Sequence, residues 1–248
     1  MGDAIEALSA EQQVVIDLAG GFSAADWDRP SGCAGWSVKD VVSHMGALYW
    51  AVVDMSKLPD AGDRPTEEAQ EFFVQHRRAM SAEEVLADYD AVKKPALDAL
   101  TALRGADFEL PLGDFGTYRT GLLANAYVFD HYTHIRADLF GPRGPLSGEL
   151  PPTDELRASS VLDWVEAALS QQAGKTLDRL DRPASLELTG WGTRTIHVGP
   201  EGEPAAIVRC DCLSFVQWAT LRLPWESLPV ETVGDVEVLN VLRGLHLF

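Results

Sequence analysis

A segment rich in proline and glycine divides this chain of 248 residues into two parts with different hydrophobic patterns. It runs from Gly141 to Thr153, reads GPRGPLSGELPPT and follows no period. Before it, apolar residues recur at helical spacing, and after it they mostly alternate as in strands. We therefore predict two domains, a helical domain over residues 1–145 and a smaller α+β domain over residues 153–248.

Four helices are expected in the first part, which is enough for an up-and-down bundle. Two of them begin at serine N-caps that have an acidic residue three positions later, Ser37 with Asp40 and Ser81 with Glu84. A bend or break is expected near Pro95. The predicted helices cover residues 5–19, 37–52, 81–100 and 117–139.

The second part reads as a small α+β domain. A helix is expected over residues 154–177, before the alternation begins. Strands are predicted over residues 185–189, 194–198 and 205–210, with glycine-containing turns between them. Further helices are expected near residues 214–221 and 236–245. The predicted fold class is therefore α+β.

The charge of the chain argues against two classes of partner. Its 20 basic and 38 acidic residues give a formal net charge of -18, which repels phosphate backbones and anionic lipids, so neither nucleic acid nor a membrane is expected as a partner. Three cysteines cannot form a complete disulfide framework, and no leader-like or membrane-spanning apolar run is visible. A soluble protein of the reduced cytoplasm is the expectation.

Three residues of the predicted bundle are candidate metal ligands. His44 borders the apolar stripe of its helix, while Asp130 and His134 lie four apart on a later helix and so share a face. Three inward ligands would hold one divalent metal and leave a coordination position open. His131 is the alternative to Asp130, because it lies three residues before His134. Two imidazoles and one carboxylate suit zinc, although they also suit non-haem iron.

Other chemistry has less support in the sequence. Cys33 is interpreted as a small residue of a packed loop, and the pair Cys210 and Cys212 as one face of a strand. The glycine-rich phosphate loop, the serine nucleophile elbow and the His-Glu-x-x-His motif are all missing from the sequence.

The stretch Trp27–His44, WDRPSGCAGWSVKDVVSH, resembles the signature of the mycothiol-dependent maleylpyruvate isomerase family, a branch of the DinB-like metalloenzymes. Asp130 and His134 match the spacing of the second ligand pair of that family, with Asp130 where the family has glutamate. The resemblance implies a DinB-like four-helix bundle followed by a sterol-carrier-like domain over residues 186–248. It also implies a catalytic role for Arg222, the counterpart of a family arginine linked to substrate or thiol binding, although the usual Gly-Arg pair is Leu221-Arg222 here.

The function expected from the resemblance is that of a metal-dependent enzyme that uses a small thiol, mycothiol, against a small electrophilic substrate. The metal would hold the thiol as thiolate, and the reaction would be either a cis–trans isomerisation or an S-transfer. A hydrolase with a metal-bound water is the alternative, and a non-catalytic metal-binding or regulatory protein on the same scaffold is a third possibility.

Overall fold

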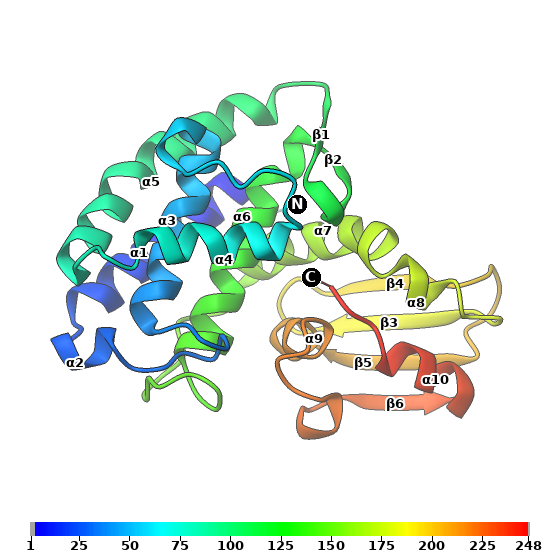
Figure 1. Cartoon of the computed structure of the whole chain (residues 1–248). Coiled ribbons are helices and arrows are strands. Elements are labelled where there is room, and N and C mark those ends of the chain that lie inside the picture. Colours follow the sequence, from blue (N-terminus) through cyan, green and yellow to red (C-terminus); the bar gives the residue numbers. More distant parts are fainter. Residues whose placement is uncertain (1–2, 248) are drawn as a thin grey trace.

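The computed structural model describes residues 3–247 and shows a group of helices beside a four-stranded sheet (Figure 1). The helices are α1 (Ala4–Gly20), α2 (Ala24–Trp27), α3 (Val38–Val53), α4 (Thr66–Arg77), α5 (Ala82–Arg104), α6 (Leu123–Thr133), α7 (Glu155–Gln172), α8 (Gly174–Leu177), α9 (Cys212–Ala219) and α10 (Val236–Arg243). The strands are β1 (Glu109–Pro111), β2 (Thr117–Arg119), β3 (Ala184–Thr189), β4 (Arg194–Val198), β5 (Ala206–Asp211) and β6 (Glu231–Gly234). The predicted α+β class is confirmed.

The bundle consists of α1, α3, α5 and α6. Helix α3 packs on α5, α5 on α1, and α1 on α6, while the end of α6 returns to α3. Both predicted serine caps are present as capping boxes, at the start of α3 and of α5. Helix α5 is not broken at Pro95, which lies inside it.

The predicted helix over residues 117–139 differs from the structure at both ends. Residues Thr117–Arg119 form strand β2, which pairs antiparallel with β1, because Tyr118 is buried between two exposed neighbours in the alternation typical of a strand. At the other end, α6 passes into a π-helical turn over His134–Leu139, which we call the π segment. Helices α2 and α4 and strand β6 were also not predicted.

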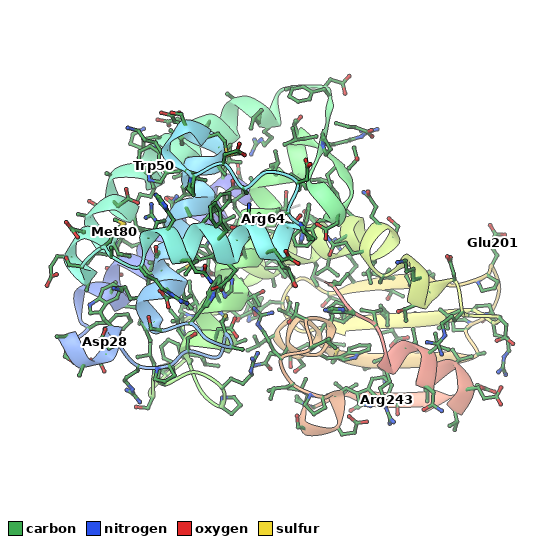
Figure 2. All side chains as sticks on the ribbon, viewed as in Figure 1. Asp28, Trp50, Arg64, Met80, Glu201 and Arg243 are labelled. Atoms are coloured by element: carbon green, nitrogen blue, oxygen red, sulfur yellow. The ribbon has the colours of Figure 1, made fainter. Side chains whose placement is uncertain are left out.

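The four-stranded sheet has the order β4-β3-β5-β6. Strands β3 and β5 are parallel, and the two outer strands pair antiparallel with them. Helix α9 packs against β3 and β5 on one side and against α6 and α7 on the other, so it joins the sheet to the bundle. Figure 2 shows side chains filling the space between these elements, with Glu201 projecting from the β4–β5 turn at the far end of the sheet.

Helix α7 and a buried ion network tie the two parts together. Helix α7 packs on α1 and α6, and one hydrophobic core continues from the bundle into the sheet. The fully buried Glu11 of α1 accepts hydrogen bonds from Arg136 of the π segment at 2.9 and 3.0 Å and from Arg157 of α7 at 2.7 Å. The domain boundary between residues 145 and 153 stays a prediction. Within residues 3–247, no helix has both the length and the apolar character to cross a bilayer.

Helix α9 ends in a Schellman motif that sets the direction of the chain at Arg222. The Arg222 N–H donates to the Gln217 carbonyl at 2.9 Å, and the Leu221 N–H donates to the Trp218 carbonyl at 3.0 Å. Leu221 takes the left-handed position of this motif, with φ +55°. Glycine is the usual residue at such a position, because it has no Cβ to clash in the left-handed conformation.

We predict that Leu221→Gly stabilises the protein by about 1 kcal/mol, because the left-handed conformation costs a non-glycine residue roughly 1–2 kcal/mol and glycine gives back part of that gain as unfolded-state entropy. Leu221 is 62% exposed, so little packing is lost. Urea unfolding measures the difference. Leu221→Ala is the matched control and should bring no gain, and a glycine variant that is no more stable than the alanine variant would contradict the prediction.

A buried polar cluster centred on His131 lies inside the bundle. The His131 Nδ1–H donates to the Tyr127 carbonyl at 2.9 Å, which leaves Nε2 to accept from the hydroxyls of Tyr49 at 2.9 Å and Tyr89 at 3.1 Å. Burial lowers the pKa of His131 from 6.5 to about 4. His131 therefore remains neutral in the folded protein at neutral pH.

This cluster should make stability depend on pH. The pKa of His131 is lower in the folded than in the unfolded state, so its contribution is fully present above pH 6.5 and is lost as the pH falls toward 4. Between pH 7 and pH 5 the wild type should lose about 2 kcal/mol more than His131→Gln. Urea unfolding at both pH values, with a chelator present, tests this; parallel pH profiles for the two proteins would rule it out.

Candidate metal centre

His44 lies in the second turn of α3, and the capping box at Ser37 fixes where that helix begins. The Asp40 N–H donates to the Ser37 hydroxyl at 3.2 Å, and the Ser37 N–H donates to the Asp40 carboxylate at 3.0 Å. Seven residues into the helix from its cap, His44 is buried, with 5% exposure. Its ring lies against Asp130 near the end of α6 and against His134, the first residue of the π segment.

The structure brings together the three residues predicted as metal ligands. Asp130 Oδ1 lies 3.2 Å from His44 Nε2 and 3.5 Å from His134 Nε2. The two imidazole rings meet edge to face, with 5.0 Å between their centroids. One ligand atom from each residue thus lies within 4.8 Å of the others.

These separations fit a small divalent cation. A tetrahedral zinc ion with bonds of about 2.0–2.2 Å holds its ligand atoms about 3.3–3.6 Å apart. The second carboxylate oxygen, Asp130 Oδ2, is buried without a hydrogen-bond partner in the part of the chain that the structure describes. Such an atom is costly unless something else satisfies it. The donor set and its spacing are therefore those of a site for a metal with nitrogen and oxygen ligands.

The electrostatics of the site keep Asp130 ionised. Burial raises the pKa of this carboxyl, but the charges of His134 and His44 together outweigh it and hold the pKa well below its usual range. The pKa of His134 shifts the opposite way. Burial lowers it, but Asp130 and the other acidic neighbours outweigh burial and hold the pKa well above its usual value. The site therefore offers an anionic oxygen to a cation at neutral pH.

Trp36 covers the two histidines. Its ring centroid lies 5.1 Å from that of His44 and 6.3 Å from that of His134, with the second pair stacked. The indole N–H donates to Glu71 of α4 at 2.5 Å, and α4 packs across α3. The indole thus shields the two rings from solvent and is itself fixed by the helix that the sequence did not predict.

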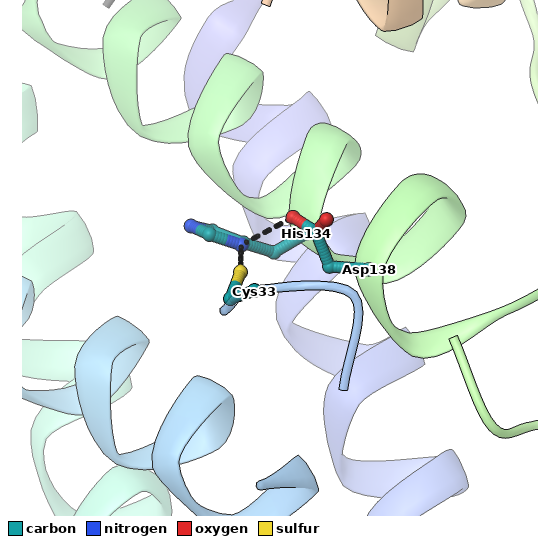
Figure 3. A group of neighbouring side chains, drawn as sticks. All are labelled: Cys33, His134 and Asp138. Atoms are coloured by element: carbon teal, nitrogen blue, oxygen red, sulfur yellow. Dashed lines mark hydrogen bonds and ion pairs between the residues drawn. The ribbon is translucent and has the colours of Figure 1, made fainter. Parts of the chain in front are cut away.

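Cys33 and Asp138 lie at the opposite edge of the His134 ring (Figure 3). The Asp138 carboxylate lies 2.9 Å from His134 Nδ1, and the Cys33 sulfur lies 3.6 Å from the same nitrogen. Together with His134 they form a second group that could hold a cation. We prefer the first group, because Asp138 is already engaged by two arginines. The sequence signal for Asp138 was its position four residues after His134.

Arg222 reaches the centre through Asp138. Its guanidinium donates to Asp138 Oδ2 from Nε at 2.9 Å and from Nη2 at 2.6 Å, and Arg143 lies 3.3 Å from Oδ1. Burial raises the pKa of Asp138, but the contacts with His134 and Arg222 reverse the shift and leave it below its usual range. The arginine expected to be catalytic is thus paired with a carboxylate that bonds a candidate ligand.

Close packing of the Cys33 loop against Asp138 explains one glycine of the signature. The Gly32 N–H donates to the Asp138 carbonyl at 2.7 Å, and the Arg143 guanidinium donates to the Gly32 carbonyl. A Cβ at Gly32 would lie 2.9 Å from the Cα of Asp138, which is too close for any other residue. The sequence interpretation of Cys33 as a packed loop residue missed its proximity to His134.

The alternative ligand His131 is engaged by other partners: its Nδ1, at 3.6 Å from Asp130 Oδ2, donates to the Tyr127 carbonyl, and its Nε2 faces the hydroxyls of Tyr49 and Tyr89. The interpretation of Cys210 and Cys212 as one face of a strand was wrong. Cys210 lies in β5, but Cys212 begins α9, since Asp211 caps that helix. Both thiols are buried, and burial raises their pKa to about 12.

Comparison with known proteins agrees with this geometry. No curated protein matches the sequence. Over 94% of its length the chain resembles two crystal structures of the mycothiol-dependent maleylpyruvate isomerase, one of them a histidine-to-alanine mutant, with TM-scores of 0.61 and 0.60, 13% identity and 93% coverage of those chains. These likenesses show the fold. The family model of the mycothiol maleylpyruvate isomerase N-terminal domain matches residues 8–139, more than half of the sequence, and the chain therefore belongs to this family.

Proposed function

We propose that the chain is a metal-dependent enzyme that uses a small thiol, with His44, Asp130 and His134 as the ligands of one divalent ion, zinc by preference. The observation that carries the proposal is the convergence of three ligand atoms within 4.8 Å of one another, with both histidine nitrogens at 3.2–3.5 Å from one oxygen of Asp130. Three protein ligands leave one position for a further molecule.

Mycothiol is the thiol we propose, because the family and the structural neighbours are named for their dependence on it. A bound divalent ion supplies one piece of chemistry here, a lower pKa for a thiol at the open position. The centre is of the kind that catalysis by a thiolate requires, because it combines a cation site with partial exclusion of water.

The side chains of the protein have distinct tasks in this proposal. Asp130 supplies the negative charge of the ligand set, and because only 20% of its side chain is exposed, water screens that charge only in part. Trp36 limits the access of water over the two imidazoles. Asp138 accepts a hydrogen bond from the Nδ1–H of His134, so that Nε2 is the nitrogen that lies on the side of Asp130 and of a bound ion.

The substrate we propose is a small electrophile. Addition of the thiolate to a conjugated carbon, rotation about the weakened carbon–carbon bond and elimination of the thiol would make the enzyme a cis–trans isomerase, whereas addition or displacement without elimination would make it an S-transferase. We place the activity in the cytoplasm, where Cys33, a free thiol beside His134, would stay reduced.

We expect His44→Ala and His134→Ala each to weaken zinc binding by more than the roughly 10–100-fold that follows loss of an outer hydrogen-bond partner. Asp130→Asn should behave in the same way, because it removes the anionic ligand. His131→Gln is the matched control, since this neighbouring histidine bonds to tyrosines instead. Elemental analysis and competition with a chromophoric chelator measure the binding. Stoichiometric zinc in His44→Ala, or a larger loss in His131→Gln than in Asp130→Asn, would refute the ligand assignment.

We expect millimolar mycothiol to give the cobalt-substituted protein a thiolate-to-metal charge-transfer band and to release about one proton per bound thiol near pH 7. The S-methylated thiol is the control and should do neither, because it cannot form a thiolate. Turnover of an activated electrophile should then depend on the thiol. An unchanged cobalt spectrum together with thiol-independent hydrolysis would replace this proposal by the hydrolase, and a wild-type protein without metal would point to a non-catalytic role.

A further inference from the structure

The carboxylate of Asp138 is fully buried and bonded on every side by charged or polar groups. It is 0% exposed, and its oxygens meet His134 of the same π segment, Arg143 of the following loop and Arg222 of the sheet-containing part. Two guanidinium groups on one carboxylate leave a local excess of positive charge, although the chain as a whole carries -18. An arrangement so costly to bury needs a reason beyond packing.

The bond from His134 to Asp138 decides which nitrogen of the imidazole is free. Flanked by two guanidinium groups, Asp138 is a carboxylate, and a carboxylate only accepts hydrogen bonds. His134 therefore carries a proton on Nδ1, at 2.9 Å from Asp138, and Nε2 is the nitrogen whose proton a bound metal ion would displace. Nε2 is the atom that lies 3.5 Å from Asp130. The ring is thus held in the tautomer and orientation that a metal ligand needs.

His44 has no equivalent arrangement. Its Nδ1 is buried and has no hydrogen-bond partner among residues 3–247, and its ring is positioned by contact with Trp36 and His134. Orientation by a hydrogen bond is therefore concentrated on one of the two histidines. This asymmetry makes Asp138 the group whose loss should disturb the ligand set most.

Arg222 donates to Asp138 from the sheet-containing part of the molecule, directly after α9. The Schellman motif at the end of α9 turns the chain at Leu221, and from there both Nε and Nη2 of Arg222 bond Oδ2 of Asp138. Because the same oxygen accepts from His134 Nδ1, a shift of Arg222 would move the carboxylate that holds the ring. The contact links α9 to a candidate ligand through a single carboxylate.

We propose that Asp138 is a positioning residue of the metal centre and that Arg222 acts on the centre through Asp138. The proposal rests on the ligand assignment made above. It changes the interpretation of Arg222 from a residue that touches substrate to one that holds the ligand set from the second part of the chain. The packing of the sheet-containing part against the bundle and the geometry of the metal centre are then coupled.

The experiment uses the full chain with zinc and cobalt as probes. Asp138→Asn should weaken zinc binding 10–100-fold and broaden or shift the visible cobalt spectrum. Arg222→Met should change both in the same direction by a smaller factor, because Arg143 still engages Asp138. Proton spectra of the zinc form should show the Nδ1–H of His134 far downfield in the wild type, as expected for a hydrogen bond to a carboxylate, and upfield of that position in Asp138→Asn.

The matched control is Asp163→Asn. Asp163 of α7 bonds Arg194 of β4 at 2.7 Å, so this substitution breaks a similar Asp–Arg pair between the helices and the sheet without touching the centre. It should leave zinc affinity, the cobalt spectrum and the position of the His134 Nδ1–H signal unchanged. If Asp138→Asn does not fold, Arg222→Met alone carries the test.

The possible results separate this inference from the proposed function. A wild type that binds no zinc would refute the ligand assignment and this proposal with it. A wild type that binds zinc, with the same affinity in Asp138→Asn, would overturn the proposal and leave the ligand assignment standing. Wild-type zinc affinity in Arg222→Met, combined with a raised KM for substrate, would overturn the action of Arg222 through Asp138.

Discussion

The buried carboxylate of Asp138 is the contact on which the geometry of the centre depends. Its side chain meets His134 of its own π segment, Arg143 and Arg222, and its backbone carbonyl accepts from Gly32, so three other stretches of chain converge on one residue. Charged groups can be buried only when they are paired and hydrogen-bonded with good geometry. The arrangement is therefore specific, because displacing any one of these groups leaves a buried charge or a buried carbonyl without its partner.

The π segment makes that convergence possible. Asp130, His134 and Asp138 are spaced four apart, and in an α-helix each such step rotates the side chain by about 40° around the axis. A π turn closes on the fifth residue and holds more residues, so the step from His134 to Asp138 rotates in the opposite sense. The three side chains then stay in one row, with Asp130 and Asp138 at opposite edges of the same imidazole. Such irregular turns are frequent at functional sites.

Much of the fold could be predicted because its signals are local. Serine caps at Ser37 and Ser81 mark the helix starts, and alternation marks β3, β4 and most of β5. Helix α4 lacks a side-chain cap, and its remaining signal was charge, with Glu67 and Glu68 in the first turn and basic residues in the last. Strands β2 and β6 have four residues or fewer, too few for alternation to stand out, and β6 in addition depends on β5, a strand well before it in the chain.

The centre shows the same division between local and tertiary information. The spacing of Asp130 and His134 indicates that they share a helix face, and the structure brings His44 to them, but spacing could not decide between Asp130 and His131. That choice depends on Tyr49 and Tyr89, which lie on other helices and engage His131 in the core. For Arg222 the resemblance to the family indicated the residue itself. Its partner, Asp138, could not be predicted from any sequence pattern. Its contact with Asp138 exists only because α9 ends in a left-handed turn beside the π segment. A candidate functional residue can thus be named from sequence, while the contacts that would give it a role depend on the packing of parts distant in the chain.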